Sequence, residues 1–241
     1  MDFNKEKIFE FFKDLEFDEP SHVYSWKGSK VSVSVSGLIK KFEKPVDFIA
    51  ISEKVAAKEG TTAEAVRKRW EHKKNKACRK GTEVHLFGEL YPFNQKNMTP
   101  TNGYEEAIVK FWQGLPDFIV PVMMELQMYH KDFGYAGTAD IILYDKRNNT
   151  FIIADYKTNE DLFKNFRGKT LKAPFDHLLH NSYNKYQLQL SFYQILFEQM
   201  GLQVSQRRLV WLRPSGEFTM YSCKDYTKEL KECLENELVA A

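Results

Sequence analysis

Three apolar runs joined by short polar turns are the feature that most constrains the fold of this 241-residue chain. The runs occupy 119–130, 135–144 and 150–157, and the polar cluster 145–149 separates the second from the third. Clusters rich in Asp, Asn and charged residues favour turns, and runs of this length favour strands. The sequence therefore predicts a meander of three antiparallel strands.

The third run ends in an acid and a base on one face. Asp155 and Lys157 are separated by one residue, Tyr156. Because side chains alternate across a strand, positions i and i+2 point to the same side. The carboxylate can bind a divalent metal ion, and the ammonium group beside it can stabilise negative charge that develops during a reaction.

Two more acids are predicted to join this pair. A hairpin symmetric about 147–148 places Asp140 opposite Asp155, and a turn centred on 132–133 places Glu125 opposite Asp140. Opposed residues of an antiparallel pair share a face, with Cβ atoms about 4.5–5.5 Å apart. Carboxylates at that spacing repel one another unless a cation lies between them. A slip of one residue in register would move every partner to the other face.

Each residue also has an ordinary alternative role. Asp140 could be a turn former, Glu125 a solvent-facing strand residue and Lys157 a solvated lysine. Because the predicted strand pairing brings all of these residues together, we favour a metal site over these separate roles.

These motifs resemble those of a known family. The pattern G-x-x-D at 137–140, followed by an apolar strand ending in D-x-K at 155–157, resembles the PD-(D/E)XK nuclease superfamily. It looks most like the RecB/Cas4-like branch, which includes phage-type exonucleases. The segment 81–85 resembles the upstream G-x-x-x-H helix motif of that branch, and 189–193 resembles its Q-L-x-x-Y helix motif. The stretch 172–186 is similar to a linker in phage members, and the resemblance covers roughly residues 75–215.

The resemblance implies a fold and a set of site residues. The fold would be α/β (α+β), with a restriction-endonuclease-like core whose central mixed sheet is flanked by helices. It implies one or two Mg²⁺ or Mn²⁺ ions held by His85, Asp140, Asp155 and the backbone carbonyl of Tyr156. Asp140, Asp155, Lys157 and an auxiliary Glu125 would form the catalytic set. DNA would be contacted by Gln189, Tyr193, Tyr186 and Lys185.

The activity implied is hydrolysis of phosphodiester bonds from DNA ends, in phage or mobile-element recombination or DNA processing. A structure-selective or flap endonuclease of the same fold is one alternative, and a catalytically silent DNA-binding protein is another. The expected partner is linear DNA, single-stranded or duplex, with a single-strand annealing or binding protein as a further candidate. The expected location is the cytoplasm, that of the host if a phage encodes the protein.

Composition limits the ways in which the chain can bind DNA. The net charge of +2 excludes a global basic field, so local patches at 67–80 and 164–172 would have to serve. Aromatic residues interleave with and follow the second patch, as a groove for single strands requires. Cys78, Cys223 and Cys233 show no C-x-x-C spacing, so we expect no iron–sulfur cluster and a reducing compartment. We also expect no signal peptide and no membrane association.

The remaining pattern predicts an accessory N-terminal lobe over 1–75 and a nuclease core over 76–241. Helices are expected at 4–17, from 36, over 61–76, 79–90, 103–113 and 183–200, and from about 225. A short strand is expected around 31–35, and two further strands at 204–213 and 217–222.

Overall fold

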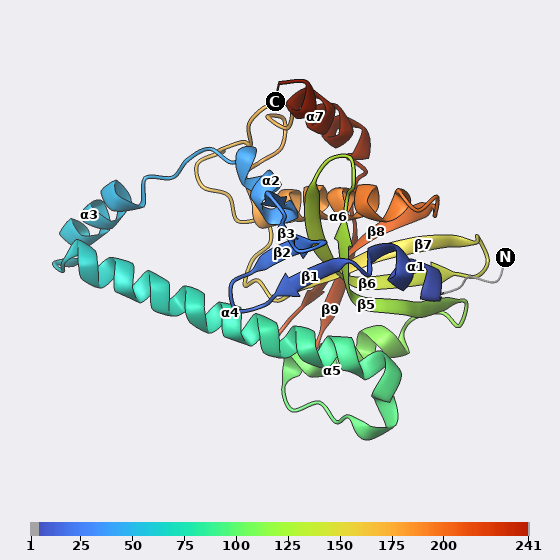
Figure 1. The fold of residues 1–241 in the computed structure, drawn as a ribbon. Helices are drawn as coiled ribbons and strands as arrows, with labels where there is room; N and C mark the ends of the chain where they lie inside the picture. Colours follow the sequence, from blue (N-terminus) through green and yellow to red (C-terminus); the bar gives the residue numbers. More distant parts are fainter. Residues whose placement is uncertain (1–4, 241) are drawn as a thin grey trace.

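A mixed six-stranded sheet forms the centre of an α+β fold in the computed structural model of the protein, which describes residues 5–240 and the side chains up to 236 (Figure 1). Strands β4, β6, β7, β8 and β9 follow one another in that order, and β5 pairs with β6. Their bounds are Val33–Ser34 (β4), Ile119–Tyr129 (β5), Tyr135–Asp145 (β6), Thr150–Lys157 (β7), Val204–Leu212 (β8) and Phe218–Ser222 (β9). β7 and β8 run parallel, whereas β5, β6 and β7 form an antiparallel meander.

The predicted strands are confirmed, and so is the register around the three acids, whereas a bulge between Pro121 and Met123 shifts the start of β5 by one residue. Ile141 pairs with Ala154 in the β6–β7 ladder, and Met124 pairs with Ile141 in the β5–β6 ladder. Continued by one residue, the first register places Asp140 opposite Asp155. The turns at 130–134 and 145–149 fix both alignments, as their polar composition predicted.

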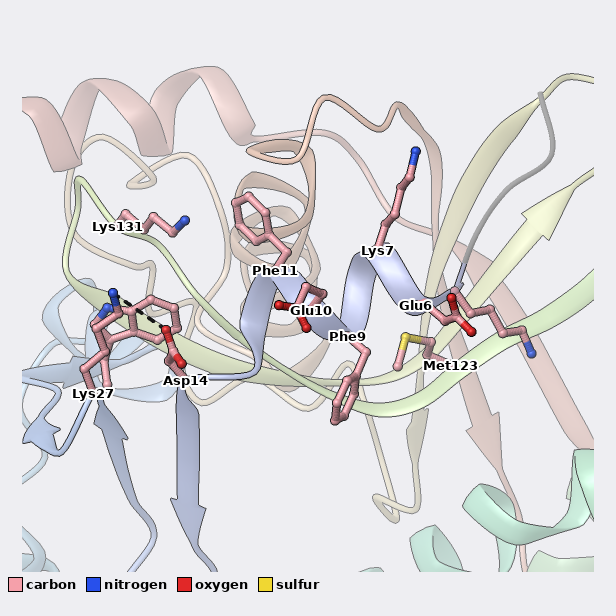
Figure 2. Close-up of a pocket in the computed structure, with 11 residues that line it drawn as sticks. Glu6, Lys7, Phe9, Glu10, Phe11, Asp14, Lys27, Met123 and Lys131 are labelled. Atoms are coloured by element: carbon pink, nitrogen blue, oxygen red, sulfur yellow. Dashed lines mark ion pairs between the residues drawn. The ribbon is translucent and has the colours of Figure 1, made fainter.

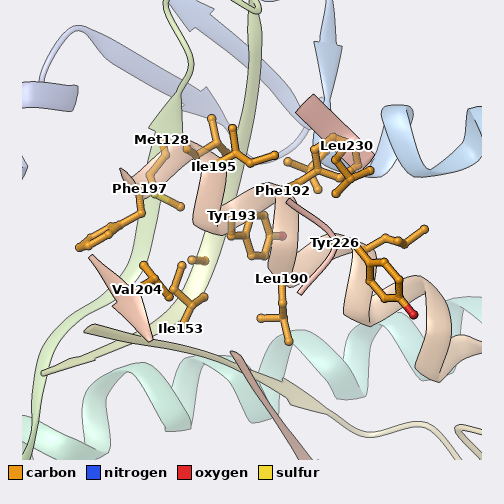
Figure 3. Packing of buried hydrophobic residues seen from close by; sticks show 14 of the residues in the cluster. Met128, Ile153, Leu190, Phe192, Tyr193, Ile195, Phe197, Val204, Tyr226 and Leu230 are labelled. Carbon is orange, nitrogen blue, oxygen red and sulfur yellow. The ribbon is translucent and has the colours of Figure 1, made fainter. Parts of the chain in front are cut away.

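Helices cover the two faces of the sheet with separate cores. One core packs α6 (Ser182–Glu198) against the sheet, and Figure 3 shows Leu190, Phe192 and Ile195 of this helix among the buried side chains. The other core joins the C-terminal half of α4 (Ala63–Asn94) and α5 (Gly103–Gln113) to the opposite face. α7 (Thr227–Ala240) packs against α6.

The N-terminal part is more strand-rich than predicted. α1 spans Lys5–Phe12, so it ends before the predicted end at residue 17. Residue 4 of the predicted helix lies outside the described residues. Leu15–Asp18 (β1), Val23–Trp26 (β2) and Ser29–Lys30 (β3) then form a small antiparallel sheet. The helix prediction was wrong beyond Phe12 because Leu15 and Phe17 alternate with acids in a strand pattern that pairs with β2.

The two helices predicted at 61–76 and 79–90 form one continuous helix of 32 residues, α4. Thr62 caps it, because its hydroxyl oxygen accepts a hydrogen bond of 3.1 Å from the Ala65 N–H. A predicted break near residue 77 was wrong because none of the residues at that point has to end a helix. The predicted division at 75/76 lies inside α4 and stays a prediction.

The N-terminal half of α4 extends away from the sheet together with α3 (Phe48–Glu59), as Figure 1 shows. α2 (Val35–Lys41) begins at Ser34, whose hydroxyl accepts a hydrogen bond from the Gly37 N–H, and it packs on α6. A short 3₁₀ turn, η1 (Gln95–Asn97), follows α4. Among the described residues, none of the helices has the length and apolar character needed to cross a membrane.

Candidate functional site

The predicted acids lie where β6 changes its strand neighbour. β5 pairs along one edge of β6, so β4 and β7 share the other edge. β4 reaches Tyr135 and Ala136, whereas β7 begins to pair only at Ile141. Residues 137–140 therefore lie at a fork in the sheet, where this backbone edge of β6 is paired with neither β4 nor β7.

His85, Glu125 and Asp140 meet at this fork. One nitrogen or oxygen atom from each lies within 4.8 Å of the other two. The His85 Nδ1 atom is 3.4 Å from Asp140 Oδ2 and 3.7 Å from Glu125 Oε1. α4, β5 and β6 each contribute one of these residues, so the cluster depends on the tertiary fold.

Two backbone features position the carboxylates. The N–H of Tyr156 donates a hydrogen bond of 2.9 Å to Asp140 Oδ2, which ties this side chain to β7. Glu125 has a φ of +49°, in the left-handed region that residues other than glycine rarely adopt. Such backbone strain, on the order of 1–3 kcal/mol, is concentrated at functional sites. Here it accompanies the approach of Glu125 to His85.

Asp155 and Lys157 form an ion pair beside this cluster. The Asp155 side chain is 1% exposed and that of Lys157 is 13% exposed. Within the described residues, the carboxylate oxygens of Asp155 accept no hydrogen bond of normal geometry in addition to this pair. A buried carboxylate with spare acceptor capacity is costly unless a further cation or donor joins it.

A close contact between α4 and β7 sets the position of His85. A Cβ atom on Gly88, one turn after His85, would lie 2.5 Å from Cε2 of the Tyr156 ring. The Tyr156 hydroxyl in turn accepts a hydrogen bond of 2.8 Å from Trp112 Nε1 of α5. The absent side chain at Gly88 thus allows α4 to approach the sheet closely enough for His85 to reach Asp140.

The charges perturb one another strongly. Burial alone would lower the pKa of His85, but the neighbouring Asp140 and Glu125 outweigh it and raise this pKa to about 9. Burial, assisted by the charge of Asp140, raises the pKa of Asp155 to about 6 in spite of Lys157. Burial also raises the pKa of Asp140. The site therefore holds protons that a divalent cation would displace.

The donor set suits a hard or borderline divalent metal. His85, Glu125 and Asp140 offer one imidazole nitrogen and two carboxylates, which Mn²⁺ accepts readily and Mg²⁺ tolerates. Asp155, predicted as a ligand, lies outside this group of three and pairs with Lys157 instead. Glu125, predicted as auxiliary, lies inside it.

The residues predicted to contact DNA have more varied surroundings. Gln189 Nε2 donates a hydrogen bond of 2.7 Å to the Tyr193 hydroxyl, as their i, i+4 spacing indicated. Tyr193 is 5% exposed and packs in the core, and Lys185 forms an ion pair of 3.3 Å with Glu43. Tyr186 lies with its ring 4.5 Å from the Lys157 Nζ atom. Tyr186 and Gln189 are therefore better placed to meet a ligand than Tyr193 or Lys185.

The sequence reasoning missed the residues that act through contacts between elements. Gly88 and Trp112 support Tyr156, and Asn159 joins Tyr186 to Trp211 through hydrogen bonds of 2.9 and 2.8 Å. A helical glycine three residues after His85 was a signal for close packing. Nothing in the local sequence marked the tryptophans as neighbours of the site.

A large pocket of about 970 Å³ lies elsewhere, between α1 and the sheet (Figure 2). The described residues that line it mix lysines with acids and include Phe11, Trp26 and Met123, but none of the predicted site residues. The convergent charges at His85 are a stronger indication of chemistry than the size of this pocket.

Comparisons with known proteins add little to this geometry. No family model matches the chain, and no curated protein matches it. A solved structure of a protein designated SSO0001 is similar over 98% of this chain and 84% of its own, with 13% identical residues and a TM-score of 0.39. A likeness at this level carries no argument about family or function.

Proposed function

We propose that the protein is a metal-dependent DNA exonuclease built on a PD-(D/E)XK-type core. The observation that carries this proposal is the meeting of His85, Glu125 and Asp140 within 4.8 Å, beside the pair Asp155–Lys157 at the end of β7. Three groups that favour a divalent cation, next to a buried lysine, form a set suited to phosphodiester hydrolysis.

One Mg²⁺ or Mn²⁺ ion, or two, would be held by His85, Asp140 and Glu125, with Asp155 and the Tyr156 carbonyl completing the set. A bound ion of this kind supplies Lewis acidity and a more acidic water. The protein would orient its ligands through the Tyr156 N–H on Asp140 and through the packing of Gly88 on the Tyr156 ring. Both contacts join helices and strands, which fix the positions of the ligands more firmly than loops would.

Lys157 would stabilise negative charge that grows on the phosphate. Burial tends to lower the pKa of Lys157, but Asp155 and Asp140 raise it above its ordinary value, so the side chain stays protonated at neutral pH. A fixed cation of this kind acts where charge develops and needs no reorganisation during the reaction.

The projecting half of α4 supports DNA as the substrate. Between residues 63 and 80 this helix carries eight Lys or Arg residues and two Glu residues, and most of these side chains are exposed. Arg67 lies five helical turns before His85 and on the same face, at a distance of about 27 Å along the axis. Cations along such a rod can contact phosphates without reading sequence.

Further parts of the proposal concern the need for a DNA end, the biological role and the cellular compartment. The requirement for an end, and a role in phage or mobile-element recombination with a single-strand annealing or binding protein, follow from the motif resemblance. A cytoplasmic setting is supported by Cys78 and Cys223, which are free thiols.

The test compares linear and closed circular DNA, both duplex and single-stranded, in Mg²⁺ or Mn²⁺. End-labelled linear strands should shorten from one end while circles persist, and the matched variant Asp140→Asn should leave all substrates intact. Cutting of both circles by the native protein would reject the end requirement in favour of an endonuclease. Absence of metal-dependent hydrolysis on every substrate would reject the nuclease proposal.

A further inference from the structure

A row of aromatic side chains begins at Lys157 and continues along the sheet. The Tyr186 ring lies 4.5 Å from Lys157 Nζ, and its hydroxyl donates a hydrogen bond of 2.9 Å to Asn159 Oδ1. Trp211 Nε1 of β8 donates a hydrogen bond of 2.8 Å to the Asn159 carbonyl. Two rings from different elements are thus tied to one residue that closely follows the D-x-K motif.

The row continues from Trp211 towards the loop after β7. Its ring centroid is 6.4 Å from that of Tyr221 on β9, which is 5.5 Å from that of Phe163. Tyr183, at the start of α6, lies 5.0 Å from Phe163. Consecutive rings from four separate segments therefore lie within contact of one another and are only partly buried.

The loop that follows Phe163 is basic and carries one more exposed aromatic side chain, Phe166. Phe163 is 44% exposed and Phe166 is 63% exposed, values unusual for phenylalanine in a well-packed loop. Arg167 and Lys169 lie 5.1 and 5.8 Å from the Phe166 ring centroid. Residues 163–172 contain four Lys or Arg residues and no acid. An aromatic surface next to a cluster of cations is typical of a groove for single-stranded nucleic acid.

The loop that carries these residues is held in place by its own hydrogen bonds. Asn165 Nδ2 donates to the carbonyls of Lys169 and His180, at 2.8 and 3.0 Å. Asp161 Oδ1 accepts hydrogen bonds from the backbone N–H groups of Phe163 and Lys164, at 2.8 and 3.0 Å. The loop therefore displays Phe166 from a fixed frame, which lowers the ordering cost of binding.

We propose that this aromatic row, made of Phe163, Tyr183, Tyr186, Trp211 and Tyr221 and extended by the exposed Phe166, binds single-stranded DNA and directs the strand to the Asp155–Lys157 pair. The inference rests on the proposed function and adds that the DNA strand enters the site in single-stranded form. Bases of a single strand can stack on these rings, and the strand's phosphates can meet Arg167 and Lys169. Bases inside a duplex are already stacked on each other and cannot use the row.

The test measures the binding of a short fluorescent oligothymidylate and of a blunt duplex by anisotropy in EDTA, so that hydrolysis does not interfere. Phe166→Ala should weaken binding of the single strand about 5- to 150-fold, which corresponds to about 1–3 kcal/mol per stacked base, and leave duplex binding unchanged. The matched control is Phe48→Ala, since Phe48 is a similarly exposed phenylalanine, at 64%, and belongs to α3, which contributes no residue to the row. Its single-strand affinity should equal that of the native protein.

The two proposals fail in different ways. Native-like single-strand binding by Phe166→Ala, or an equal loss in Phe48→Ala, would overturn the aromatic row and leave the nuclease intact. Hydrolysis of bis(p-nitrophenyl) phosphate with Mn²⁺ needs only the metal centre and should be the same in both variants and the native protein. Absence of that hydrolysis in the native protein, with the binding loss retained, would overturn the nuclease and leave the single-strand row.

Discussion

Gly88→Ala should disturb the site without replacing any proposed ligand. The added Cβ would lie 2.5, 3.1 and 3.2 Å from three atoms of the Tyr156 ring, whereas ordinary contacts begin near 3.4 Å. The ring cannot move freely because it is buried and its hydroxyl bonds Trp112. Either α4 moves away by about 1 Å or the ring is displaced, and both changes shift His85 relative to Asp140.

Gly81→Ala on the same helix provides the matched control. No atom lies within 4 Å of a Cβ at Gly81, so this variant should gain only helix propensity, about 0.5–1 kcal/mol. Gly88→Ala gains the same propensity but adds about 1–3 kcal/mol of overpacking. The difference between the two variants therefore isolates the packing cost.

Urea denaturation and thermal melts measure this difference, at about 2–4 °C per kcal/mol for a chain of this size. We expect Gly88→Ala to be the less stable variant by about 1–3 kcal/mol and to lose about 100-fold in hydrolysis, since a misplacement of about 1 Å carries such a cost. Equal stability and equal activity of the two variants would show that the Gly88–Tyr156 contact does not position His85.

Four further predictions concern the charged residues. Asp140→Asn should abolish hydrolysis and retain the native circular dichroism spectrum; near-normal turnover would exclude Asp140 as a ligand. Lys157→Met should lower the single-turnover rate about 10²–10³-fold with little change in calorimetric Mn²⁺ affinity, and equal losses in both would assign Lys157 an organising role. Mn²⁺ affinity should rise about tenfold per pH unit below the His85 pKa of about 9 and level off above it, because the ion displaces the imidazole proton. Without metal, the stability contributed by protonated His85 should be complete below its unfolded pKa of 6.5 and lost as the pH rises through about 9; melting curves of His85→Gln should lack this dependence.

The sequence predicted the part of the site that depends on local periodicity. Alternation places Asp155 and Lys157 on one face, and two polar turns fix the register that brings Asp140 opposite Asp155. These features need only the period of a strand and the symmetry of a hairpin. They were therefore accessible without the tertiary structure.

Features that depend on packing between elements distant in the sequence could not be predicted from the sequence. Gly81 belongs to the G-x-x-x-H motif, yet of these two glycines of α4 it is Gly88 that makes a close contact. Lys185 was predicted to meet DNA, but Glu43, which is far away in sequence, pairs with it. β1 was missed because Leu15 and Phe17 fall within the amphipathic helix predicted at 4–17, and no element was predicted over β2 and β3.

The position of a bound metal ion tests the account most directly. Crystals soaked in Mn²⁺ at a pH near 8 should give an anomalous difference peak within coordination distance of His85, Glu125 and Asp140, and His85→Ala should weaken it. A peak at another place, or none at this cluster in a crystal that binds Mn²⁺ elsewhere, would contradict the proposed metal centre.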